Sequence, residues 1–142
     1  MELRSVEELM DLLYACRGSW DPPGPGRDRV DLHQHALQTA ALLRRRRPAD
    51  KELQVAGLVH AIGPLLRPAD PADAVRTLLG ERVGRLLRDH HRHPEPTDDD
   101  QLCLRQADEE GHTTDFGAGV LEDWRTVLEL VAARNSRLGA VD

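Results

Sequence analysis

Apolar residues recur along most of the chain at spacings of three and four, which places them on one face of an α-helix. Runs of this kind, bounded by capping residues and prolines, predict helices over residues 5–18, 31–46, 50–62, 72–79, 81–91, 98–108 and 121–131. The segment that begins at Leu53 is apolar on almost every side, so we expect it to be a buried central helix. No segment alternates apolar and polar residues with the period of a β-strand. The pattern therefore predicts an all-α fold.

Two segments rich in proline and glycine interrupt this pattern. Residues 19–29 include the run PPGP at 22–25 and predict an irregular loop directly before the second helix. Segments with few regular backbone hydrogen bonds often serve as lids, so we expect this loop to be mobile and to lie at a pocket mouth. Residues 111–119 are rich in glycine and predict a turn before the last helix.

Length and composition narrow the class of protein. The 142 residues fit one domain over residues 1–142. Hydrophobic residues make up 39% of the chain and aromatic residues 3%, so leucine, valine and alanine must form the core, which favours packed helices. Cys16 and Cys103 are far apart in sequence, and we expect two buried, reduced thiols rather than a disulfide.

The same composition argues against membrane and nucleic-acid partners. No stretch approaches the roughly 20 apolar residues that span a bilayer. Residues 1–13 alternate acidic residues with leucine and do not resemble a cationic signal peptide, so we expect a cytoplasmic protein. The net charge of −6 argues against binding to phosphate backbones. The basic residues 44–47 are interpreted as the solvated end of a helix.

Four polar residues occupy positions that the helical spacing assigns to buried faces. His35 lies on the inner face of the second helix, whereas His33 falls outside that face. Three further helices carry His60, His90 and Asp108 at inward positions. Burying such groups without partners costs on the order of a few kcal/mol each, and a divalent metal removes that cost. A metal pocket is therefore favoured over a hydrogen-bonded polar core, which is the alternative.

The other histidines are interpreted differently. His91 and His93 flank a proline at a helix end and are expected on the surface, with His91 able to reach the pocket edge. His112 follows the predicted end of its helix and has a weak claim to the pocket.

The segments that carry these polar residues resemble the motifs of the HD-domain superfamily. The sequences HALQTAALL at His35, LQVAGLVHAIGPLL around His60 and RLLRDHH around His90 are similar to its histidine segments. LRQADEEGHTTDFGAG around Asp108 is similar to a narrower branch, the HDIG-type oxygenases found with phosphonate-degradation genes and related to inositol oxygenase. The similarity covers residues 31–124. It implies a compact bundle of about six to seven helices and a pair of irons that activate dioxygen.

The resemblance also implies a ligand set. Carried over by position, His35, His60 and Asp108 would be ligands of the first iron and catalytic residues, and His90 would be a ligand of the second. The first three form the 2-His-1-carboxylate set of mononuclear non-haem iron sites. We therefore expect iron, as one or two ions, with manganese or zinc as substitutes.

This sequence departs from the family pattern at residues that would bind the second iron. Ala61 stands where the family has a bridging aspartate, through either natural loss or engineered replacement, and Pro64 stands where the phosphonate branch has a substrate-contacting histidine. Residues 67–74 contain no histidine for the second iron. The tyrosine and glutamate that close over substrate in the family are missing, and Asp28 is nearest to the acidic position. Two divalent ions about 3.5–4 Å apart repel without a bridging carboxylate, so we expect at most one tightly bound metal.

Three functions fit this pattern. The leading hypothesis is an oxygenase-like enzyme that cleaves a small polar metabolite, phosphonates included. Arg92, Arg105 and Asp28 are expected to contact substrate, and Arg88 lies near the same segments; the alternative for the arginines is surface ion pairing. An HD phosphohydrolase and a catalytically degenerate HD scaffold that acts as a binding protein are the other two hypotheses. A small-molecule substrate is the one partner that the sequence predicts.

Overall fold

Helices account for nearly all of the regular structure. The computed structural model describes the whole chain except residues 1, 22–29, 67–68, 94, 114–116 and 141–142. Its elements are α1 (Val6–Ala15), β1 (Trp20–Asp21), β2 (Val30–Asp31), α2 (Leu32–Arg46), α3 (Lys51–Val59), the 3-10 turn η1 (His60–Ile62), α4 (Gly63–Leu66), α5 (Pro71–Leu79), α6 (Glu81–Arg92), α7 (Asp99–Thr113), the 3-10 turn η2 (Leu121–Trp124) and α8 (Arg125–Ala140). Seven of the described helices have nine residues or more, which confirms the all-α prediction. None of them is long and apolar enough to cross a lipid bilayer.

Side-chain caps fix four of the predicted helix starts. The capping residues each accept a hydrogen bond from the backbone N–H three residues later, and they are Ser5, Asp31, Asp50 and Asp98. Only half of the predicted capping box forms, because the Glu8 carboxylate accepts from the backbone N–H of Arg4 instead of that of Ser5. The two central helices, α2 and α3, therefore begin where the sequence indicates.

Two segments that were expected to be irregular are partly regular. α7 does not end at residue 108 but continues through Gly111 to Thr113, because its last turns pack against α2. Residues 20–21 and 30–31 pair as short antiparallel strands, with Trp20 opposite Asp31, and they tie the chain to the start of α2. The rest of this predicted loop, residues 22–29, lies outside the described residues, as do its expected mobility and its expected place at a pocket mouth.

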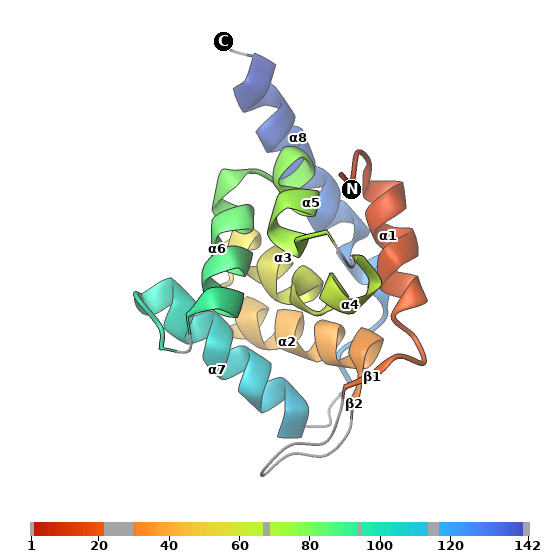
Figure 1. The fold of residues 1–142 in the computed structure, drawn as a ribbon, viewed down its shortest axis with the longest axis vertical. Coiled ribbons are helices and arrows are strands. Elements are labelled where there is room, and N and C mark those ends of the chain that lie inside the picture. The colour runs from red at the N-terminus through yellow and green to blue at the C-terminus, as the bar shows by residue number, and fades with distance from the viewer. Residues whose placement is uncertain (1, 22–29, 67–68, 94, 114–116, 141–142) are drawn as a thin grey trace.

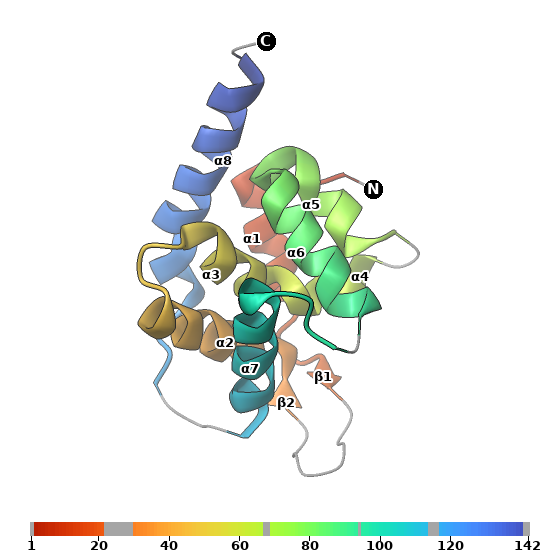
Figure 2. The ribbon, with the colours of Figure 1, turned by 90° about the vertical axis from the view of Figure 1, so that its left-hand side faces the viewer.

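The helices α2 and α3 form the centre of the molecule, and α7 lies across α2 (Figures 1 and 2). Every residue of α3 from Leu53 onward is buried, as its apolar sequence predicts. α2 is buried on more sides than predicted. His33, expected outside the inner face, is only 9% exposed because α1 covers it. Its Nδ1 donates to the backbone carbonyl of Leu13 at 2.7 Å, and its ring stacks on Tyr14.

The remaining core agrees with the apolar pattern. The four inward positions predicted for the last helix are all buried, and they are Leu121, Trp124, Leu128 and Val131. Cys16 and Cys103 are buried thiols without a disulfide, as expected. Burial, followed by the charge of Asp31, raises the pKa of Cys16 to about 11.

A glycine allows α2 and α3 to cross closely. A Cβ at Gly57 would overlap with the Cδ1 atom of Leu43 and come within 3.3 Å of the Cγ2 atom of Thr39. Any larger residue would push the two helices apart. The close crossing brings the end of α3, where His60 begins the 3-10 turn, against the face of α2 that carries His35.

Candidate metal centre

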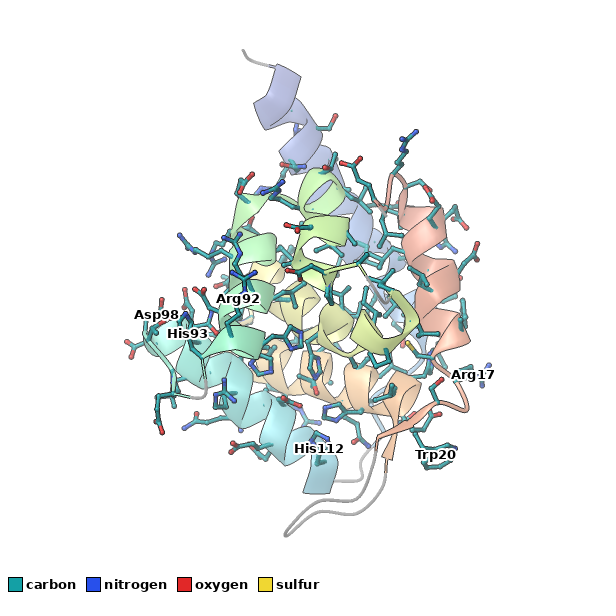
Figure 3. All side chains as sticks on the ribbon, viewed as in Figure 1. Arg17, Trp20, Arg92, His93, Asp98 and His112 are labelled. Atoms are coloured by element: carbon teal, nitrogen blue, oxygen red, sulfur yellow. The ribbon has the colours of Figure 1, made fainter. Side chains whose placement is uncertain are left out.

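Four histidines surround the carboxylate of Asp108, and they come from four different elements. His35 lies on α2, His60 begins η1, His90 lies in the last turn of α6, and His112 follows Asp108 by one turn on α7. Figure 3 shows His112 near the end of α7. Each of the four histidines is 8% exposed or less, and the Asp108 side chain is 22% exposed. The fold thus gathers groups that are far apart in sequence into one buried polar cluster.

Three atoms of this cluster have the spacing of a metal-binding face. His35 Nε2 lies 2.7 Å from Asp108 Oδ1, His60 Nε2 lies 3.1 Å from the same oxygen, and the two nitrogens are 3.2 Å apart. Ligands bound at right angles to one metal with bonds of about 2.1 Å are about 3.0 Å from one another. The three atoms therefore match one face of an octahedral site without movement of the backbone.

The tautomer of His60 supports the same interpretation. Its Nδ1 lies 2.5 Å from the backbone oxygen of Gly57, and because a carbonyl only accepts, Nδ1 must carry the proton. In the neutral ring, Nε2 then presents a lone pair to the Asp108 carboxylate. Two electron-rich atoms at this distance repel unless a proton or a metal ion lies between them. The polar-core alternative thus requires a proton among these atoms, on a charged His60 or on His35 Nε2, whereas a metal site requires the neutral His60 ring.

The electrostatics favour metal-binding forms of the other two groups. Burial raises the pKa of Asp108, but the charge of His60 and the hydrogen bonds from the surrounding histidines outweigh it and hold that pKa well below its usual range. Burial lowers the pKa of His35 by more than the hydrogen bond to Asp108 raises it. Without a metal, the carboxylate is therefore ionised beside a charged His60 while His35 is neutral, and a bound metal ion would take the place of the His60 proton.

His90 approaches Asp108 from the other side. Its Nε2 lies 2.9 Å from Oδ2, whereas His35 and His60 approach Oδ1. The rings of His60 and His90 are 5.8 Å apart between centroids and meet edge to face. Asp108 thus separates His90 from the three-atom face, an arrangement in which one carboxylate could serve two neighbouring positions.

His112 belongs to the cluster, although its sequence position gave it a weak claim. His35, Asp108 and His112 each offer a ligand atom within 4.8 Å of the other two, so these three residues could hold a metal ion. The Nδ1 atom of His112 donates to the backbone oxygen of Asp108 at 2.9 Å, and its ring centroid lies 3.9 Å from that of His35. The signal in the sequence was the i, i+4 spacing of Asp108 and His112, which places both on one helix face.

Glycine also brings α7 close to α2. A Cβ at Gly111 would lie 2.9 Å from the hydroxyl oxygen of Thr39 and 3.1 Å from Cε1 of His35. Since any side chain at this position would press on the His35 ring, the glycine lets Asp108 and His112 reach the pocket.

A cavity of about 320 Å³ adjoins the cluster, which is enough for a small ligand. Its walls are formed by the five residues of the cluster together with Leu32, Ala61, Pro64 and His91. Ala61 therefore presents a methyl group to the cavity.

Of the three residues expected to contact substrate, one lines a cavity, one does not, and one lies outside the described residues. Arg92 lines a second cavity, and its Nη2 lies 3.7 Å from Oδ2 of Asp70; Figure 3 shows it at the end of α6. Arg105 lines neither cavity, because its Nη2 donates to the backbone oxygens of His90 and His93 at 3.1 and 2.7 Å. It therefore holds the end of α6 against α7. Asp28 lies outside the described residues.

Comparison with known proteins finds no match either to a family model or to a curated protein.

Proposed function

We propose that the chain is a metal-dependent protein of the HD type with an oxygenase-like activity on a small polar metabolite. The observation that carries this proposal is the face formed by His35 Nε2, His60 Nε2 and Asp108 Oδ1, whose edges measure 2.7, 3.1 and 3.2 Å. Two imidazoles and one carboxylate on one face leave the other coordination positions open, which is typical of non-haem Fe(II) oxygenases. His112 and His90 are the candidates for a further ligand.

Bound iron would supply the one-electron chemistry that dioxygen requires. The chain contributes the rest of the site. Asp108 supplies the negative charge, and His60 is oriented by its hydrogen bond to the Gly57 carbonyl. The adjoining cavity of about 320 Å³ has room for a small substrate beside the open positions.

A degenerate HD scaffold that binds a ligand without turnover is the second candidate, and Ala61 is the observation that favours it. The methyl group of Ala61 lines the cavity and offers no oxygen to bridge two metals. Alanine at position 61 also disfavours an HD phosphohydrolase, because that reaction relies on metal-bound water beside a carboxylate.

Metal analysis and oxygen uptake test the proposal. Protein purified without chelators and loaded anaerobically with Fe(II) should retain about one iron per chain. The variant His60→Ala should lose most of that iron, whereas His93→Ala, an exposed histidine outside the cluster, should retain it. Negligible metal in the unchanged chain after loading with Fe(II), Mn(II) and Zn(II) would refute the metal centre.

Measurements of oxygen uptake and phosphate release then distinguish the oxygenase, the hydrolase and the binding scaffold. The iron-loaded protein should consume oxygen in the presence of a member of a panel of small phosphonates and polyols. Release of phosphate from phosphate esters without oxygen uptake would identify a hydrolase instead. Metal binding without either reaction would leave the binding scaffold as the correct alternative.

A further inference from the structure

A second cavity, of about 290 Å³, opens beside the metal cavity; we call it the vestibule. The two cavities share three lining residues, His60, Pro64 and His91. A molecule that reaches from the metal cavity into the vestibule would therefore pass along the His60 ring. The outer wall of the vestibule is formed by α6, the start of α5 and the segment that follows η1.

Among the described residues, the charged groups that line the vestibule are two arginines and one aspartate. Arg88 and Arg92 are one turn apart on α6, so their side chains lie on the same face of that helix. Asp70 lies opposite, but one of its oxygens accepts from the backbone N–H of Ala72 as the cap of α5. The other is 3.7 Å from Arg92 Nη2, a long contact for an ion pair. The vestibule thus carries excess positive charge in a chain whose net charge is −6.

Arg88 differs from the other partly buried arginines that the structure describes. Arg82 contacts three carboxylates, Arg47 and Arg125 each contact at least one, and Arg105 donates to two backbone carbonyls. Arg88 has no hydrogen bond or ion pair with any described residue. Among the described residues nothing therefore competes for the Arg88 guanidinium, and an incoming anion would form charge-assisted hydrogen bonds with it.

We propose that the vestibule binds the anionic end of the substrate. The substrate is then a small molecule with two polar ends: oxygen atoms that reach the face formed by His35, His60 and Asp108, and a separate carboxylate or phosphoryl group held by Arg88 and Arg92. This inference rests on the proposed metal-dependent function, whose site it completes. It assigns the anion to Arg88 and Arg92 rather than to Arg105, whose guanidinium holds the end of α6.

Dicarboxylates of graded length test this proposal on the Zn(II)-loaded protein at constant ionic strength. Calorimetry with malonate, succinate and glutarate should find one that binds at least about tenfold more tightly than acetate, because only a diacid can engage both ends. Arg88→Gln should remove that advantage, and Arg92→Gln should reduce it by a smaller factor, since Arg92 already contacts Asp70.

Arg85→Gln is the matched control, because Arg85 lies on the same helix, is exposed and lines neither cavity. It should leave diacid binding unchanged. Equal affinities in the Arg88→Gln and Arg85→Gln variants, or no diacid advantage in the unchanged chain, would overturn the proposal.

The proposal for the metal centre can be wrong while the proposal for the vestibule is correct, and a separate titration distinguishes the two. If the protein retains no zinc, the same variants are titrated with inorganic phosphate in the metal-free state. Weaker phosphate binding in Arg88→Gln than in Arg85→Gln would then support the vestibule while the metal centre is refuted. Equal phosphate binding in the two variants would refute both.

Discussion

Replacing Gly111 with alanine tests the metal centre without removing any ligand. Alanine is favoured over glycine in a helix interior by about 1 kcal/mol, so α7 itself should gain stability. The new Cβ would lie 2.9 Å from the Thr39 hydroxyl and 3.1 Å from His35 Cε1. Crowding of this kind costs about 1–3 kcal/mol, so the metal-free protein should change by about zero to 2 kcal/mol in the destabilising direction.

The effect on metal binding should be larger and more specific. The His35 ring must move by a few tenths of an ångström, and ligand distances at metal sites tolerate only about 0.2 Å. Changes in the groups that orient a ligand typically reduce metal affinity by about 10- to 100-fold. We therefore expect Gly111→Ala to weaken Zn(II) binding by at least about tenfold, which corresponds to about 1.4 kcal/mol.

Two measurements on each variant decide the outcome. Competition with a chelator gives the zinc affinity, and urea unfolding of the metal-free protein gives its stability. Gly117→Ala is the control, because a Cβ there has no neighbour within 4 Å and should change neither measurement by much. If Gly111→Ala gains about 1 kcal/mol of stability and keeps its zinc affinity, His35 is not a metal ligand held against α7.

Further predictions concern other parts of the molecule. His60→Ala should abolish most metal binding by elemental analysis, and unchanged binding would remove His60 from the ligand set. Ala61→Asp adds a carboxylate at the cavity wall and should strengthen metal binding; a weaker affinity would show that position 61 does not face the metal. Hydrogen bonding to Arg82 holds the pKa of Asp50 below its usual range. The ionised Asp50 carboxylate therefore stabilises the folded state near neutral pH, and this stabilisation is lost on acidification. The unfolding free energy should therefore fall less between about pH 5 and pH 3 in Asp50→Asn than in the unchanged chain, and equal slopes would contradict this. Because burial raises the pKa of Cys16 to about 11, this thiol should resist alkylation at pH 8 in the folded protein, and rapid labelling by mass spectrometry would contradict its burial.

The all-α fold class and four of the site residues could be predicted from helical spacing alone. Apolar residues at spacings of three and four mark the buried faces, and the structure buries those positions in α2, α3 and α8. The polar residues predicted on such faces are His35, His60, His90 and Asp108, so the same helical spacing identifies both the core and the polar residues within it. Periodicity works here because these helices are long or wholly buried, and their faces are set by local sequence.

The prediction missed features that depend on contacts between helices. His33 lies outside the inner face of α2 by spacing, yet α1 covers it, and spacing along one helix cannot report what another helix covers. Gly111 was assigned to a turn because glycine weakens an isolated helix. In the fold, the absence of a side chain allows α7 to pack on α2, so the helix continues and carries His112 into the cluster.

Arg105 and Arg88 illustrate the same limit for charged groups. Both lie near metal-ligand segments, and the sequence analysis predicts that Arg105 rather than Arg88 contacts substrate. The structure separates them by their partners, because Arg105 donates to the carbonyls of His90 and His93 whereas Arg88 contacts no carboxylate or carbonyl of the described residues. A guanidinium that already donates to backbone oxygens is poorly placed to bind an anion, whereas one without a partner among the described residues can donate to it.

The charges of the proposed site explain how the methyl group of Ala61 fits an anionic substrate. Asp108 is the one acidic residue among the described residues that line the metal cavity. A divalent ion bound by two neutral imidazoles and this carboxylate would retain one net positive charge. A carboxylate at position 61 would neutralise it, whereas the methyl group of Ala61 leaves it to attract an oxyanion from outside the protein. The two arginines of the vestibule add positive charge along the same path. Alanine rather than aspartate at position 61 therefore disfavours a second metal and, by the same electrostatic argument, favours an anionic ligand.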